Sequence, residues 1–96
     1  MRGKTVALGD ALVVYLRETG LEQSVLETRL VEQWGSIMGD TVARLTRSVE
    51  AKNGMLFVRI SSAALKAQLF ECRFELVAKL NTAMGAKVIR DVRILG

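Results

Sequence analysis

The sequence predicts an α+β domain with the element order α-α-β-β-α-β, in which helices pack on one face of a three-stranded mixed sheet. Three observations predict this class. Apolar residues recur at helical spacing before residue 40, an Asn53-Gly54 pair separates two strand-like runs, and a second helical run ends at Gly85 before a last strand. The chain has 96 residues, enough for one domain with one modest core. We expect that domain to span residues 1–96.

The first helix is expected over about residues 6–18. Its apolar side chains follow the i, i+3, i+4, i+7, i+8 spacing of one buried helix face: Leu8, Ala11, Leu12, Tyr15 and Leu16. Gly20 follows, and a glycine in that place is free to adopt the left-handed conformation that ends a helix.

A second helix is expected to begin at Ser24, because Ser24 and Glu27 have the spacing of a capping box, in which two side chains satisfy backbone N–H groups reciprocally. Its apolar stripe comprises Leu26, Leu30, Trp34 and Ile37. Trp34 is therefore expected in the core rather than stacked on a ligand. Gly35 indicates either close packing or a bend, and Gly39 ends the helix.

After residue 43 the helical spacing of apolar residues ends, and the pattern becomes that of two strands joined by a tight turn. Asn53-Gly54 tolerates the positive φ angles of a two-residue turn, so it joins two antiparallel strands, expected over Arg44–Lys52 and Met55–Ile60. A last strand is expected over Lys87–Ile94. The helix between the second and third strands brings the last strand back parallel to the second.

That connecting helix is expected to run unbroken over about residues 63–84, with Ser61-Ser62 as its N-cap and Gly85 after its end. Its core stripe comprises Leu65, Leu69, Cys72, Leu76, Leu80 and Ala83. Phe70, Phe74 and Val77 are expected to widen this stripe. Asn81 is expected to hydrogen-bond a nearby backbone or loop.

Composition excludes several kinds of chemistry. There is no histidine and one cysteine, which rules out histidine catalysis, histidine or cysteine metal sites and an intramolecular disulfide. No glycine-rich nucleotide loop occurs. We therefore expect no enzyme, no metal and no cofactor. No apolar run has the length of a membrane span and the first residues make a poor signal peptide, so we expect a cytoplasmic protein without membrane contact.

Charge is split along the chain. Residues 1–43 carry four basic and six acidic side chains, whereas residues 44–96 carry ten basic and four acidic ones, which gives net charges of −2 and +6. The positive part is also the part that contains the predicted strands. A basic sheet region suggests a polyanionic partner, of which nucleic acid is the commonest, and an ordinary solvated surface is the alternative.

The predicted strands place the candidate site. Because Leu56, Val58 and Ile60 point toward the helices, Phe57 and Arg59 face the open side of the sheet. An aromatic ring among arginines suits single-stranded nucleic acid, whose bases stack on rings while guanidinium groups bind phosphates. The candidate nucleic-acid-binding residues are Arg44, Arg47, Phe57, Arg59, Lys66 and Arg93.

These candidates come from different elements. Arg93 joins the open face from the last strand and Arg44 from the first, while Lys66 extends the phosphate track from the first turn of the long helix. Arg47 and Arg90 fall on the nominally inner face, which indicates a bulge or frayed strand ends. Two other roles of the open face remain alternatives: a homodimer interface around Phe57, or simple exposure.

The chain resembles the DciA-related family over about residues 8–95. The resemblance rests on an ordered set of motifs: Trp34-x-x-x-x-Gly39, Ala43, Gly54-x-Leu56-x-Val58, Ser61-Ser62, Leu69, Leu80-Asn81 and Gly85. It implies a bacterial K-homology-like domain that assists the replicative DnaB-type helicase on single-stranded DNA. The G-x-x-G loop with which K-homology domains grip RNA does not occur here. The alternative function is a protein-interaction or homodimerisation module without a nucleic-acid role.

Overall fold

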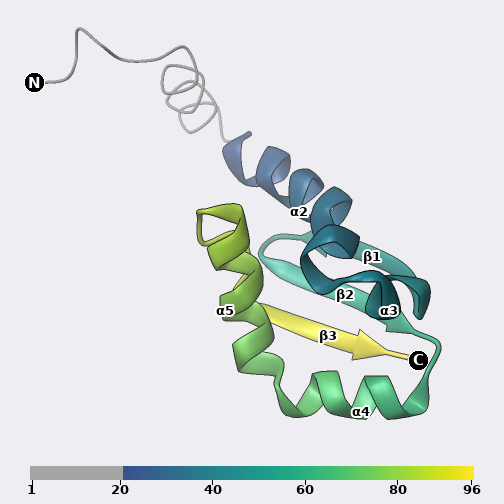
Figure 1. The fold of residues 1–96 in the computed structure, drawn as a ribbon. Helices are drawn as coiled ribbons and strands as arrows, with labels where there is room; N and C mark the ends of the chain where they lie inside the picture. Colours follow the sequence, from purple (N-terminus) through teal and green to yellow (C-terminus); the bar gives the residue numbers. More distant parts are fainter. Residues whose placement is uncertain (1–20) are drawn as a thin grey trace, which may run out of the picture.

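A computed structural model of the chain describes residues 21–96 (Figure 1). Its elements are α2 (Glu22–Met38), α3 (Asp40–Arg44), β1 (Thr46–Lys52), β2 (Met55–Ile60), α4 (Ala63–Glu71), α5 (Arg73–Met84) and β3 (Asp91–Leu95). The α+β class is confirmed. The helix expected over residues 6–18 and its terminating Gly20 lie outside the described residues. Within residues 21–96, no helix has the length and apolar character needed to cross a membrane.

The sheet has the predicted topology. Its strand order is β1-β2-β3, with β1 antiparallel and β3 parallel to the central β2. β2 has the bounds expected from the sequence. Asn53 and Gly54 both adopt positive φ angles, of 53° and 82°, so they make the predicted tight turn between β1 and β2.

The core lies between one face of the sheet and the helices. Leu56, Val58 and Ile60 of β2 are 0–2% exposed and belong to one buried cluster with Leu30 and Trp34 of α2. In Figure 1, α2 and α3 lie in front of β1 and β2, α5 crosses the start of β3, and α4 runs beside β3 in the opposite direction. The opposite face of the sheet is therefore the one on which functional side chains are available.

Trp34 is a core residue, as expected. Its side chain is 3% exposed, and its indole Nε1–H donates to Thr46 Oγ1 at 3.1 Å. The Thr46 hydroxyl in turn donates to the carbonyl of Val42 at 2.6 Å, which ties α2, α3 and the start of β1 together. Gly35 lies inside the continuous helix α2, where a Cβ would approach Ala43 Cβ to 3.5 Å. The helix continues through Gly35 without interruption, and 3.5 Å is an ordinary van der Waals separation, so the packing of α2 on α3 leaves room for an alanine at this position.

The predicted capping box is wrong. Helix α2 begins at Glu22 with Leu21 in the N-cap position, so Ser24 lies inside the helix. Glu27 is instead buried, at 8% exposure, and its Oε2 accepts hydrogen bonds from Gly54 N–H at 2.6 Å and from Gln23 Nε2 at 2.7 Å. Gln23 Nε2 also donates to the carbonyl of Val88 at 2.8 Å. A tertiary contact with the hairpin turn thus outcompetes the local cap.

The expected single helix over residues 63–84 is interrupted at Cys72. This residue ends α4, precedes α5, and is partly buried rather than part of a continuous core stripe. An unbroken helix of that length would extend about 33 Å, whereas a six-residue strand extends about 20 Å. The interruption lets α4 pack along β3 while α5 turns to pack against α2.

The last strand is shorter than expected. It covers Asp91–Leu95, and the preceding residues form a loop in which Val88 and Ile89 are nonetheless buried. Asn81 holds this loop, as the sequence indicated. Its Oδ1 accepts the N–H groups of Val88 at 2.9 Å and Ile89 at 3.0 Å, and its Nδ2 donates to the carbonyl of Ile89 at 2.8 Å.

Candidate nucleic-acid interface

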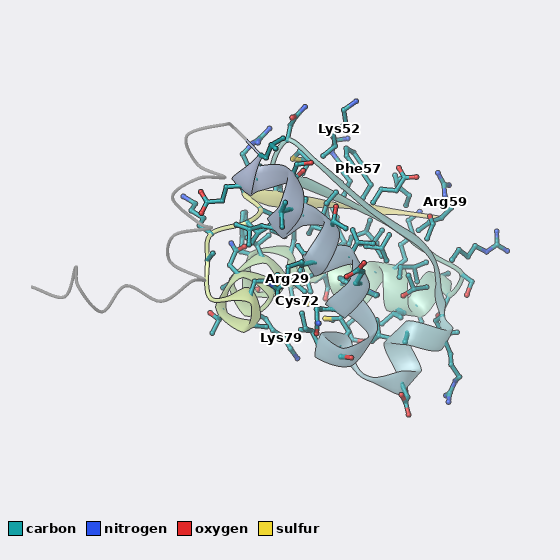
Figure 2. All side chains as sticks on the ribbon, turned by 90° about the horizontal axis from the view of Figure 1, so that it is seen from above. Arg29, Lys52, Phe57, Arg59, Cys72 and Lys79 are labelled. Carbon is teal, nitrogen blue, oxygen red and sulfur yellow. The ribbon has the colours of Figure 1, made fainter. Side chains whose placement is uncertain are left out.

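The open face of the sheet carries Phe57 and Arg59, as strand alternation predicted. In the observed register, Phe57 lies between Glu50 of β1 and Arg93 of β3. Figure 2 shows Lys52, Phe57 and Arg59 projecting from the sheet on the side away from the helices. We name this surface the basic face and define it by Lys52, Phe57, Arg59 and Arg93. Phe57 is half-buried, whereas the three cations are exposed.

The cations of the basic face are not neutralised by acids. In the described part of the chain, Lys52, Arg59 and Arg93 form no ion pair with a carboxylate. Of the two outward acids, Asp91 faces Arg73, with 3.6 Å between Oδ1 and Nε, and also accepts the N–H of Val92 at 2.8 Å. Among the described residues, Glu50 is then the remaining acid on this face, against the three cations Lys52, Arg59 and Arg93, which favours a positive potential.

Two of the candidates converge at the end of β2. Arg59 donates from Nη1 to the backbone oxygen of Gly96 at 2.8 Å. Lys66 of α4 approaches the same residue, since its Nζ lies 3.1 Å from the place that a Cβ on Gly96 would occupy. The sequence placed Lys66 near the basic strands, and the structure brings it beside Arg59 through Gly96.

Arg47 and Arg44 lie elsewhere. The register between β1 and β2 shifts between Thr46 and Ser48, so Arg47 occupies a β-bulge, as its inward position in the ideal alternation had indicated. Its side chain is exposed. Arg44 does not belong to β1: it is the last residue of helix α3, so its expected place on the open sheet face is wrong. The short helix after Gly39 extends through Arg44, the residue at which the sequence predicted the strand to begin.

Further cations gather at the hairpin end of the sheet. Arg90 donates through its side chain to the carbonyl of Asn53 and through its backbone N–H to Gly54 at 2.8 Å. Beside it, a hollow of about 370 Å³ is lined by Gln23, Asn53, Gly54, Lys87, Val88, Ile89 and Arg90. Sequence reasoning did not select Lys52, Lys87 or Arg90. The signal was available, since Lys52 precedes the predicted turn and Lys87 and Arg90 lie in the first half of the predicted last strand.

Phe70 and Phe74 correct another prediction. They do not widen the core but are 59% and 74% exposed. The guanidinium carbon of Arg73 lies 4.6 Å from the centre of the Phe70 ring and 5.1 Å from that of Phe74, which are cation–π distances. The predicted stripe itself faces the core on both sides of Cys72, since Leu69, Leu76 and Leu80 are buried, and the two rings lie outside this stripe.

No group of three or more histidine, cysteine, aspartate or glutamate side chains within residues 21–96 is arranged to hold a metal ion.

Comparisons with known proteins identify the family. The family profile described as "Dna[CI] antecedent, DciA" matches residues 7–94. Proteins named UPF0232 are similar over most of this chain: those of Mycobacterium tuberculosis and Mycobacterium leprae are 30% and 32% identical over 89 residues, which is 93% of this chain. One from Rhodococcus jostii is 26% identical over 80 residues. The chain spans about half the length of these relatives, 48%, 47% and 43% respectively. The match over nearly the whole chain shows that this protein belongs to the DciA family.

Proposed function

We propose that this domain is a non-catalytic accessory module of bacterial DNA replication, which binds single-stranded nucleic acid through the basic face and assists the DnaB-type replicative helicase in the cytoplasm. Membership of the DciA family supports the helicase part of this proposal. The nucleic-acid part follows from the surface of this chain.

One observation supports the nucleic-acid role above all: three cations that pair with no carboxylate within residues 21–96 lie on the same sheet face as a half-buried aromatic ring, and the helices α2 to α5 leave this face open. Single strands bind to such surfaces because any of the bases can stack on an aromatic ring while arginine and lysine bind the phosphates. Arg47 in the bulge and Lys66 beside Gly96 extend the positive surface past the end of β2.

A fluorescence-anisotropy titration with a labelled single-stranded oligonucleotide tests this role. If about four phosphates are neutralised, log K falls against log salt concentration with a slope near −3, at about −0.7 per phosphate. Titrations with DNA and RNA of equal sequence then show which is preferred. The absence of binding at low salt would reject the nucleic-acid role.

The helicase role is tested separately. A purified replicative helicase from the same bacterium should be captured by the tagged domain in the presence of nuclease, because a protein contact survives the removal of nucleic acid. Capture that disappears with nuclease would mean that the two proteins merely share a strand. Light scattering tests the remaining alternative, which is homodimerisation. A dimer that Phe57→Glu dissociates would show that the basic face is a self-association surface.

A further inference from the structure

Within residues 21–96, no strand pairs with the outer edge of β3. In the described sheet, β3 pairs with β2 alone, so its second edge faces α4. The N–H of Val92 is bonded to the Asp91 carboxylate, so it does not take part in the pairing with β2. Alternate residues of a strand direct their backbone groups to the same edge. The N–H and C=O of Ile94 therefore point outward as well, and an edge of this kind is a template for another strand.

A groove follows this edge. One hollow of about 430 Å³ is lined by the five residues of β3 together with Phe70 and Arg73. A second of about 360 Å³ is lined by Phe70, Ile94 and three residues of α4, Ala63, Lys66 and Ala67. The two hollows share Phe70 and Ile94, so they lie next to each other along β3 and α4, and together we name them the edge groove.

The walls of the edge groove define the chemistry of its ligand. Phe70 supplies an exposed apolar surface, and Lys66, Arg73 and Arg93 supply cations. Asp91 is the one acid among the lining residues, and it is already engaged by Arg73 and by the N–H of Val92. A complementary ligand is extended, offers backbone hydrogen-bonding groups, and combines apolar with acidic side chains.

We propose that the edge groove binds an extended acidic segment of a partner protein, which adds to the sheet as a fourth strand beside β3. Residues of that segment opposite Val92 and Ile94 share the face that packs on α4 and Phe70, so they are apolar. Residues opposite Arg93 share the open face, so they are acidic. This site does not depend on nucleic-acid binding by the basic face.

The other occupants fit less well. In a fully overlapped antiparallel pairing of two copies of β3, Arg93 of one copy would face Arg93 of the other, and like charges directly opposite are destabilising. A nucleic-acid strand has no row of N–H and C=O groups with which to continue a sheet. An acidic peptide satisfies the edge, the cations and the apolar floor together.

A labelled, blocked peptide that alternates valine with glutamate tests the proposal against the whole chain. We expect saturable binding by fluorescence anisotropy and slower hydrogen exchange at the N–H of Ile94. A version N-methylated on the edge that faces β3 should bind about tenfold more weakly, because each methyl group removes a backbone hydrogen bond. A version with lysine in place of glutamate should not bind.

Two matched variants locate the site. Phe70→Ala should weaken binding of the valine–glutamate peptide about tenfold, because it removes the apolar surface shared by both hollows. Phe74→Ala should change the affinity less than about twofold, since Phe74 is the more exposed ring and lines neither hollow. Thermal melts check that both variants fold.

Three results would overturn the proposal: no binding of the peptide, equal affinity for the N-methylated form, or equal effects of the two variants. The proposal that the basic face binds nucleic acid is tested separately, because oligonucleotide binding is measured without the peptide. If the chain forms a dimer that Phe70→Glu dissociates, the ligand of the edge groove is a second copy of the chain. If Phe70→Ala weakens the binding of an oligonucleotide, the ligand of the edge groove is nucleic acid.

Discussion

The carboxylate of Glu27 in the middle of helix α2 accepts a hydrogen bond from the backbone N–H of Gly54 at the tip of the β1–β2 hairpin, with 2.6 Å between the two atoms. The contact is buried, and it fixes the hairpin turn against the helix layer. Glu27→Ala should therefore lower the free energy of unfolding by about 1–3 kcal/mol, because it leaves the Gly54 N–H without a partner. Urea denaturation followed by circular dichroism measures the change.

Glu32 supplies the control for this prediction. It lies on the same helix but is exposed, so Glu32→Ala should change the free energy of unfolding by less than about 0.5 kcal/mol. Glu27→Gln keeps an oxygen that accepts the Gly54 N–H, so it should lower the free energy of unfolding less than Glu27→Ala does. Equal stability of Glu27→Ala and Glu32→Ala would show that the hairpin turn does not depend on the carboxylate.

Two glycines should respond oppositely to alanine. Gly54 has a φ of 82°, and a Cβ there would come within 2.5 Å of Arg90 Nη1, so Gly54→Ala should destabilise by about 1–2 kcal/mol and displace the arginine. Gly35 is helical, and a Cβ there meets Ala43 at an ordinary 3.5 Å. Gly35→Ala should thus stabilise by up to about 1 kcal/mol, through helix propensity. Thermal melts of both variants test the pair, and a destabilised Gly35→Ala would contradict it.

Elements that local sequence determines were predicted well. The bounds of β2, the turn at Asn53-Gly54 and the burial of Trp34 follow from alternation, turn residues and helical spacing, all of which act over a few residues. The open-face positions of Phe57 and Arg59 follow from the same alternation.

Elements that depend on distant contacts were not predictable in this way. Glu27 does not form the predicted local cap, because its carboxylate accepts the buried N–H of Gly54, 27 residues away. The connecting helix is interrupted at Cys72, so that α4 contacts β3 and α5 contacts α2, and Phe70 and Phe74 stay exposed beside the core stripe. Such outcomes are decided by packing, which a single-sequence periodicity does not contain.

Charge reversal on the basic face should remove nucleic-acid binding without loss of the fold. Replacement of Arg59 and Arg93 by glutamate takes two cations from the open sheet face. Affinity for a single strand at low salt should fall at least about tenfold, and the slope of log K against log salt should become shallower by about 1.4, at about 0.7 per lost phosphate contact.

A matched double variant separates position from net charge. Arg29 of α2 and Lys79 of α5 are also exposed, and Figure 2 shows both away from the labelled residues of the basic face. Arg29→Glu with Lys79→Glu changes the net charge by the same amount and should retain the salt slope. Equal losses in the two double variants would mean that binding depends on overall charge, and the basic face would no longer be the site.

Asn81 should control how firmly β3 is held at the edge of the sheet. Its amide bonds to three backbone groups of Val88 and Ile89, directly before the strand, so Asn81→Ala leaves all three without their partner and should cost about 2–3 kcal/mol. Asn81→Asp keeps the acceptor for both N–H groups but places an oxygen in front of the Ile89 carbonyl instead of a donor, so it should still destabilise, by less than Asn81→Ala. Hydrogen exchange at the amides of Val88 and Ile89 should quicken in Asn81→Ala and change less in Asn81→Asp. Unchanged exchange in Asn81→Ala would show that the buried side chains of these two residues, rather than the Asn81 amide, hold the loop and present the edge of β3 to the groove.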